Sequence, residues 1–308
     1  PTEPCAAQVE LANTAGHSQA GSRSLGIKVS CPEPGTPVRV TTPTFLLPED
    51  LHMSGYSLIA SPTLYPGQVI RAGVAASPEN PGQVQAALVL YYYNADDKPA
   101  RVSGPFADLA PGEGCQLAWT VPPLRNQPIF AAGIEIRPSS SPVALYLDYL
   151  TWDGVANTVF AKPEGSSLPH PGPSLWRQAW VNAVDQWETW GHDAFRVIQN
   201  EGRGMITTGM REWRDYKITA PVTPALIQAG GLAARVQGLM RFYALELTGG
   251  QTLRLSRVYD SARTVLAETP FAWQHWKPVT LSLETRGDRL RAWAGDRLVF
   301  DLTDAGSP

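Results

Sequence analysis

The chain lacks any apolar run that approaches the roughly 18 residues of a membrane span, and it shows no charged, then apolar leader. It also lacks an initiating methionine, so we expect a piece of a longer protein, and its compartment stays unknown. Neither half has a basic excess: residues 1–160 carry 8 basic and 13 acidic side chains, and residues 161–308 carry 17 and 15. Because polyanion binders need clustered Lys and Arg, we predict no nucleic acid partner, and the missing apolar run predicts no membrane partner.

Motifs for common catalytic chemistry are missing as well. The sequence has no Gly-x-Ser-x-Gly elbow, no His-Glu-x-x-His pair and no glycine-rich phosphate loop. Cys5, Cys31 and Cys115 match no zinc or redox spacing, so one disulfide with a free thiol and three reduced thiols both stay open. We therefore expect no catalytic residue in this chain and lean against an enzyme.

Paired carboxylates are not evident either. A sandwich glycosidase needs two acids about 5–10 Å apart, and the strand pattern Glu-x-Asp-x-x-Glu is absent. Glu201, Glu246 and Asp215 are the acids left for the alternative of a glycoside hydrolase or lyase with an atypical β-sandwich active site. The competing interpretation is that these acids pair with the many arginines. A structural or oligomerisation module is a further alternative.

Glycine and proline, with 27 and 28 residues, are abundant and scattered, and the apolar segments between them are short. Ile70, Ala72 and Val74 fall on every second position, which is the period of a half-buried strand. This pattern favours an all-β protein made of two antiparallel β-sandwich (jelly-roll) domains in tandem. The predicted strands are 25–31, 36–46, 67–75, 84–94, 115–121, 128–137, 143–152, 204–209, 215–222, 231–237, 242–247, 252–259, 264–268, 279–284, 289–294 and 297–302.

The domain boundary is predicted from composition. Residues 161–175 contain four prolines and no periodicity, which is typical of a stiff linker. We expect domains at 1–160 and 176–308, the second opening with a tryptophan-rich lead-in over 175–195 that is a short helix or irregular. Gly295-Asp296 predicts a tight hairpin turn between the last two strands.

Residues at both ends of the first domain resemble galactose-binding-like jelly rolls, a fold of many carbohydrate-binding modules. They are Ala15-Gly-His-Ser-Gln-Ala-Gly-Ser-Arg-Ser-Leu and Ala144-Leu-Tyr-Leu-Asp-Tyr-Leu-Thr-Trp. The resemblance implies a structural calcium ion at Asp148, with the backbone around residues 17–22 opposite it. Hard oxygen ligands suit calcium, but Asp148 bonding only to turn amides is the alternative.

The second domain resembles concanavalin A-like sandwiches of the lectin and glucanase type. The resemblance rests on Gly204-Met-Ile-Thr-Thr-Gly, Trp213-Arg-Asp-Tyr, Gly231-Leu-Ala-Ala-Arg, Phe242-Tyr-Ala-Leu-Glu-Leu and Leu290-Arg-Ala-Trp-Ala-Gly-Asp. The run 200–247 also resembles the C-terminal region of some bacterial ADP-ribosylglycohydrolase family proteins. That resemblance implies a covalently linked catalytic domain in the parent protein, which this chain does not contain.

Sugars are bound by aromatic faces and by planar polar groups, and the second domain has more of both. Arg235 and Gln237 are two positions apart in a predicted strand and should share its outer face. The ligand-binding residues we expect are Arg235, Gln237, Arg211, Trp213, Tyr243, Asn200 and Glu201. Trp273 and Trp276 are further surface candidates, and Tyr91-Tyr92-Tyr93 should place two rings on one face of a strand. The leading hypothesis is a non-catalytic carbohydrate-binding, or ADP-ribose-like-ligand-binding, accessory region of a larger hydrolase.

Overall fold

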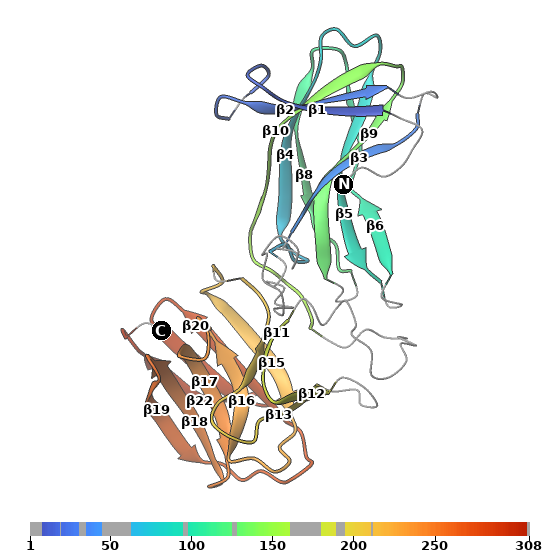
Figure 1. The fold of residues 1–308 in the computed structure, drawn as a ribbon. Coiled ribbons are helices and arrows are strands. Elements are labelled where there is room, and N and C mark those ends of the chain that lie inside the picture. Colours follow the sequence, from blue (N-terminus) through green and yellow to red (C-terminus); the bar gives the residue numbers. More distant parts are fainter. Residues whose placement is uncertain are drawn as a thin grey trace. The chain divides into compact units, whose positions relative to one another are not determined.

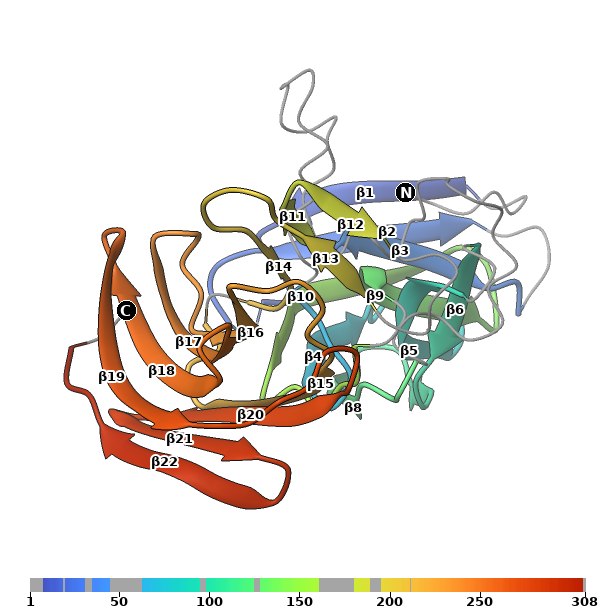
Figure 2. The same ribbon diagram turned by 90° about the horizontal axis from the view of Figure 1, so that it is seen from below.

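A computed structural model describes residues 8–18, 20–30, 35–44, 63–94, 98–124, 128–160, 180–188, 195–210 and 212–306 of the chain. The chain forms two compact units. The N-terminal unit comprises residues 1–181 and 187–196, and the C-terminal unit comprises residues 182–186 and 197–308. Figures 1 and 2 show the strands of each unit. The predicted linker lies outside the described residues, so the boundaries at 160 and 175 stay predictions.

The N-terminal unit is a sandwich of two sheets. One sheet has the order β1-β2-β10-β4-β8, and the other has the order β3-β9-β5-β6, with β7 also paired to β5. Every neighbouring pair is antiparallel. The strands are β1 (Gln8–Thr14), β2 (Ser24–Ser30), β3 (Val38–Pro43), β4 (Val69–Ala76), β5 (Val84–Tyr93), β6 (Pro99–Ser103), β7 (Ala107–Leu109), β8 (Gly114–Thr120), β9 (Ile129–Pro138) and β10 (Val143–Asp153).

The core of this unit follows from strand alternation. Ile70 and Ala72 of β4, and Leu88 and Leu90 of β5, are at most 2% exposed and belong to one apolar cluster between the sheets. Residues between them on each strand point to the outer faces, because successive side chains of a strand alternate. The predicted alternation of Ile70, Ala72 and Val74 is therefore confirmed, and the same rule places Tyr91 and Tyr93 on the outer side of β5.

The C-terminal unit is a second sandwich, whose two layers are visible in Figure 2. One sheet has the order β16-β17-β18-β19 and the other β15-β20-β21-β22, again antiparallel throughout. Leu245, Leu255, Leu283 and Leu290 are fully buried between them. The strands are β15 (Tyr216–Val222), β16 (Ala229–Ala234), β17 (Arg241–Thr248), β18 (Thr252–Tyr259), β19 (Ala262–Pro270), β20 (Val279–Arg286), β21 (Arg289–Ala294) and β22 (Arg297–Thr303).

Four short strands complete the described secondary structure. They form the pairs β11 (Val181–Ala183) with β14 (Met205–Thr207) and β12 (Gln186–Glu188) with β13 (Arg196–Ile198). The described part of the lead-in thus contains strands, and a short helix there is wrong. Within the described ranges we find no helix, and hence none that could span a membrane. The prediction of an all-β protein built from antiparallel β-sandwiches is confirmed, as is the Gly295-Asp296 turn between β21 and β22.

Candidate functional site

The predicted ligand-binding surface centres on Arg235, which does not lie where the sequence pattern placed it. Strand β16 ends at Ala234, and Arg235 follows with a φ of 50°. Gln237 is exposed in the next turn, where its N–H donates to Arg241 O at 2.8 Å. The expectation that Arg235 and Gln237 share one strand face is wrong, because the left-handed backbone at Arg235 takes the chain out of the sheet.

The Arg235 side chain donates hydrogen bonds to two loops of the C-terminal unit and so connects them. Its Nε donates to Arg214 O at 2.9 Å, and its Nη2 donates to Gly287 O at 2.7 Å and to Asp215 Oδ1 at 3.2 Å. Asp215 Oδ1 also accepts from Gly287 N–H at 2.9 Å, so this carboxylate bonds both to Arg235 and to the second loop. Since 13% of the Arg235 side chain is exposed, its donors serve the fold rather than an open surface.

Tyr243 belongs to the core of the C-terminal unit. It is 1% exposed, and its O–H donates to Asp304 Oδ2 at 2.9 Å. Burial, together with the Asp304 carboxylate, raises the pKa of Tyr243 far above its ordinary value. The expectation that Tyr243 faces a ligand is wrong, because alternation along β17 points it inward with Leu245 and Leu247.

Asn200 and Glu201 are exposed in the turn after β13. The backbone N–H and the Nδ2 of Asn200 donate to Asp185 Oδ2 at 2.9 and 3.1 Å. The carbonyl of Glu201 accepts from Gln199 Nε2 at 2.5 Å. These contacts fix the turn, and a ligand at Asn200 or Glu201 stays a prediction.

Trp213 is half-buried against an aromatic neighbour. Its ring meets Tyr216 edge to face with 6.4 Å between the centroids, and Tyr216 Oη accepts from Arg235 N–H at 2.7 Å. A Cβ at Gly209 would lie 2.7 Å from Cζ3 of Trp213, so the indole needs a glycine there. The structure thus brings together Trp213, Tyr216 and Arg235, whereas Arg211 lies outside the described residues.

Two of the three acids of the hydrolase alternative, Glu246 and Asp215, are engaged by basic groups. Glu246 on β17 accepts from Arg254 Nη2 at 3.3 Å and is also paired with Arg263. Asp215 is held by Arg235, as described above. Both carboxylates thus form ion pairs within the C-terminal unit.

Asp148 is the extra residue of a β-bulge in β10, where pairing with β4 shifts. Its Oδ2 accepts from Ala20 N–H at 2.7 Å, so the structure brings this carboxylate to the loop that the jelly-roll resemblance implies. The described residues contain no group of three His, Cys, Asp or Glu side chains that could hold a metal. A calcium ion would therefore need loop carbonyl oxygens, of which Gly16 O and Gly21 O already accept from hydroxyl groups at 2.7 and 2.8 Å. Carboxylate and carbonyl oxygens are the hard ligands that calcium prefers, and Asp148 supplies the one negative charge among them. The calcium ion stays a prediction.

A different arrangement lies on the outer side of the β3-β9-β5-β6 sheet. Tyr91 and Tyr93 project there from β5, and Phe130 joins them from a bulge in β9. The Phe130 ring stacks on Tyr93 with centroids 4.4 Å apart and an interplanar angle of 23°, and it lies 5.9 Å from Tyr91. All three rings are half-buried, so part of each contacts solvent. The bulge is what turns Phe130 toward the tyrosines.

The same side of the sheet carries a charged network around Glu135. Arg39, directly across from Glu135 on β3, donates from Nε to Oε2 at 2.8 Å. Arg137 donates from Nε and Nη2 to Oε1 at 3.0 and 2.8 Å, and Ser103 Oγ donates to Oε2 at 2.9 Å. The Glu135 side chain is 1% exposed, whereas that of Arg137 is 42% exposed. Arg137 also lies over the Phe106 ring, 4.0 Å from its centroid.

Glu135 remains ionised in this network. Burial alone raises the pKa of a carboxyl group, but the hydrogen bonds from Arg39, Ser103 and Arg137 outweigh burial and lower the pKa of Glu135 below its ordinary value. A buried ion network stabilises a fold weakly, because desolvation offsets most of the Coulomb energy. Arg137 is the member of the network that reaches solvent.

We call this region the aromatic–arginine face. The aromatic and charged groups lie four positions apart along β5, from Tyr91 to Ala87 opposite Glu135, which is about 13 Å at the usual strand rise. Its residues are Arg39, Tyr91, Tyr93, Ser103, Phe130, Glu135 and Arg137.

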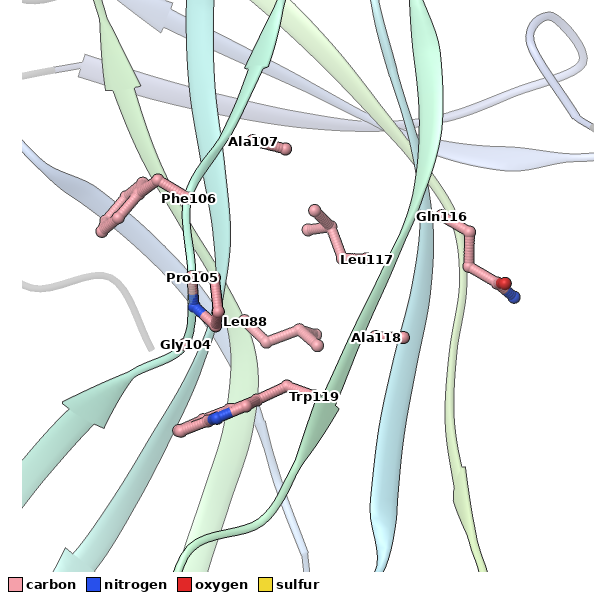
Figure 3. Close-up of a pocket in the computed structure, with 9 residues that line it drawn as sticks. All are labelled: Leu88, Gly104, Pro105, Phe106, Ala107, Gln116, Leu117, Ala118 and Trp119. Carbon is pink, nitrogen blue, oxygen red and sulfur yellow. The ribbon is translucent and has the colours of Figure 1, made fainter.

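Phe106, whose ring lies under Arg137, also lines a small pocket (Figure 3). It has a volume of about 170 Å³ and lies between β8 and the segment that joins β6 to β7. Its floor is apolar, with the Trp119 indole against Gly104, where a Cβ would lie 2.8 Å from Cδ2. Ligand sites usually measure about 300–1,000 Å³, so this pocket is too small to hold a sugar chain by itself.

Sequence reasoning missed Arg39 and Glu135, although a signal was present. Each is a lone charge between β-branched residues, in Val38-Arg-Val and Ile134-Glu-Ile. Alternation alone places both side chains on an outer face. Their mutual contact depends on the register of β3 with β9, 96 positions apart in sequence.

Comparisons with known proteins give structural similarity only. No family model matches the chain, and no curated protein matches it. A solved structure described as concerning the promiscuous specificity of carbohydrate-binding modules from the β-sandwich superfamily aligns at 14% identity with a TM-score of 0.37, over 50% of this chain and 56% of that chain. The chain thus spans little more than half of that protein.

Two further solved structures align at similar levels. Carbohydrate-binding module CBM66 from Bacillus subtilis aligns at 22% identity with a TM-score of 0.36, over 41% of this chain and 79% of that one. The C-terminal family 22 carbohydrate-binding module of Clostridium thermocellum Xyn10B aligns at 16% identity with a TM-score of 0.34, over 50% and 86%. At these values function is argued from the side chains of the chain itself.

Proposed function

We propose that the chain is a carbohydrate-binding protein whose N-terminal unit takes a glycan on the aromatic–arginine face. One observation carries the proposal: a single sheet face presents a stacked aromatic group and a fixed array of planar polar groups. Sugars expose an apolar ring face and pairs of hydroxyl groups, so a binding surface needs both devices. Tyr91, Tyr93 and Phe130 supply the first. Arg137, which is 42% exposed and held by the buried Glu135, supplies the second.

The charged network supports binding more than catalysis. Arg137 uses Nε and Nη2 for Glu135, which leaves Nη1 of a half-exposed guanidinium to donate to a hydroxyl group. Glu135 is 1% exposed and is kept ionised by two guanidinium groups, so it holds Arg137 in place and is not suited to protonate a leaving group. Because the network is already ordered, little side-chain entropy is lost when a ligand binds.

We further propose that the chain is an accessory region of a larger hydrolase. The support is the resemblance of residues 200–247 to the region that follows the catalytic domain in some bacterial ADP-ribosylglycohydrolase family proteins. The same resemblance makes an ADP-ribose-like compound the alternative ligand. It enters the test below as a separate titration.

Native electrophoresis of the full chain through gels that contain soluble xylan, β-glucan, mannan, galactan or levan tests the proposed site. We expect retardation by at least one polysaccharide, and calorimetry with the matching oligosaccharide then gives the affinity. Tyr93→Ala and Arg137→Ala should each weaken binding about tenfold, which corresponds to ~1.4 kcal/mol. Matched controls on the opposite sheet are Tyr146→Ala and Arg71→Ala, which should bind like the wild type.

Two results contradict the proposal. One is the absence of retardation by every polysaccharide. The other is a bound sugar whose affinity is unchanged by both Tyr93→Ala and Arg137→Ala. Heat released by ADP-ribose and not by any oligosaccharide would replace the glycan with the nucleotide-sugar alternative.

A further inference from the structure

Two loops at one end of the C-terminal sandwich are bonded to each other. Residues 223–228 join β15 to β16, and residues 271–278 join β19 to β20. Trp276 N–H donates to Pro224 O at 2.9 Å, and His275 Nδ1 lies 2.5 Å from Ala225 O. Because a carbonyl oxygen can only accept, His275 donates from Nδ1. Two hydrogen bonds therefore connect the two loops.

This pair of loops exposes two large apolar side chains. Leu226 is 96% exposed, and Trp276 is 69% exposed. Trp276 also has a φ of 64°, in the left-handed region that a bulky side chain rarely adopts. A protein does not gain stability from a large exposed ring on strained backbone. Strain of this kind is found where a side chain is held in place for function.

The loop beneath Trp276 is anchored in the core. Trp273 is 7% exposed, its Nε1 donates to Thr248 O at 2.9 Å, and its N–H donates to Gln251 Oε1 at 2.8 Å. The His275 ring packs edge to face on Trp273, with 5.1 Å between centroids. The prediction of a surface position is thus wrong for Trp273, which is a core residue, and is confirmed for Trp276. The buried indole gives the exposed one a rigid base.

We propose that Trp276 is the platform of a second glycan-binding site, in the C-terminal unit, that stacks a pyranose ring on its indole. Gln274, His275 and Lys277 are exposed beside it and supply donors and acceptors for hydroxyl groups. A rigid aromatic platform with polar neighbours suits a sugar because the ring is held without further loss of entropy.

The charge of the loops favours a sugar over a lipid surface. Residues 223–228 carry no charged side chain, and residues 271–278 carry one, Lys277. Peripheral membrane binding relies on several basic residues around the apolar ones, each contributing about 1 kcal/mol near an anionic surface. A single lysine provides little of that attraction.

The test uses the full chain with the N-terminal site weakened by Tyr93→Ala, in the same polysaccharide gels. In that background we expect residual retardation by at least one polysaccharide, which Trp276→Ala abolishes and Trp276→Tyr retains. Tyr259→Ala is the matched control, because Tyr259 is an exposed aromatic of the same unit outside these loops, 45% exposed. It should leave retardation unchanged.

A stability measurement separates a platform from a structural residue. Glycine tolerates a positive φ, so the melting temperature of Trp276→Gly should equal or exceed that of Trp276→Ala. The affinity for the glycan should fall about tenfold or more in both variants. A drop in melting temperature of many degrees in both variants would mean that Trp276 is structural, and would overturn the proposal.

Two binding outcomes also overturn it. One is that the Tyr93→Ala protein and the Tyr93→Ala/Trp276→Ala protein are retarded equally. The other is Trp276-dependent sedimentation with phosphatidylcholine–phosphatidylglycerol vesicles without retardation in any gel, which would make the loops a membrane-contact site. If Trp276→Ala weakens binding and Tyr93→Ala does not, the second site stands and the proposed site of the N-terminal unit fails.

Discussion

Glu135 is a charged residue that is almost fully buried, and its stabilising effect should depend on pH. Its pKa is lowered from the ordinary 4.5 by Arg39, Ser103 and Arg137 against the opposing effect of burial. A lowered pKa stabilises the folded state fully above pH 4.5, and that contribution is lost as the pH falls through the folded-state pKa. Glu135→Gln should reduce the free energy of unfolding by about 3 kcal/mol at pH 7, since it leaves two guanidinium groups without their counter-ion.

Urea unfolding at pH 7, 5 and 3 measures this difference. The difference in free energy of unfolding between wild type and Glu135→Gln should narrow below pH 4.5, because Glu135 is protonated there in the unfolded chain and, at a lower pH, in the folded protein. Glu10→Gln is the matched control, as Glu10 forms an exposed pair with Lys28 at 3.8 Å and should change stability by less than about 1 kcal/mol. A gap that stays constant down to pH 3 would contradict the assigned ionisation.

Asp148 allows the calcium prediction to be tested at a single residue. With one carboxylate and backbone oxygens, affinity should lie in the millimolar range typical of sites with few charges. We expect 10 mM calcium chloride to raise the melting temperature by a few degrees over the value in EDTA, because an ion that binds only the folded state stabilises it. Asp148→Asn should lose this response. Equal melting temperatures in calcium and EDTA would favour the alternative, in which Asp148 bonds to turn amides such as that of Ala20.

At the scale of elements, the end of β16 decides what Arg235 does. Because its guanidinium bonds to Arg214, Asp215 and Gly287, Arg235→Ala should destabilise the C-terminal unit by about 3 kcal/mol. Glycan affinity should stay the same. Chemical unfolding and calorimetric titration of the variant measure both quantities.

The control for this variant is a surface arginine of the same unit. Arg241 pairs with Asp260 at 2.6 Å, and both side chains are well exposed, so Arg241→Ala should change stability by less than about 1 kcal/mol. An Arg235→Ala protein with native stability and lost binding would restore the ligand-binding interpretation of Arg235.

Strand interiors were predictable from sequence, whereas strand ends were not. Alternation in residues 68–74 marked β4, and the Tyr91-Tyr92-Tyr93 triplet gave the correct faces of β5. The predicted strand 231–237 continued past Ala234, because residue pattern does not reveal a left-handed φ at a non-glycine position. β1 was missed because it is a mostly exposed edge strand without an apolar face.

The candidate site was harder to predict from the sequence than the fold, because its residues come from several strands. The aromatic–arginine face joins residues of β3, β5, β6 and β9, so it depends on sheet order and register. A sequence shows which residues face outward, but not which strands become neighbours. Trp276 was found from sequence because its signal is local: an aromatic among polar residues in a loop.

At the scale of the whole chain, two binding sites on one polypeptide should act together on a polymer. A hexasaccharide can fill either site separately, so Tyr93→Ala and Trp276→Ala should reduce its binding independently. A long polysaccharide offers many units to both sites, and the second contact then forms at a high effective concentration. Each single variant should therefore lose much more retardation by the polymer than its affinity for the hexasaccharide suggests.

The double variant Tyr93→Ala/Trp276→Ala completes the comparison. On the hexasaccharide its effects on the two sites should add, because each site lies in its own unit and binds its own ligand. On the polymer, either single change should already remove the avidity and leave only the weak retardation of the remaining site, which the double variant then loses. Strictly additive losses on the polymer would contradict joint binding and indicate two sites that act on separate chains.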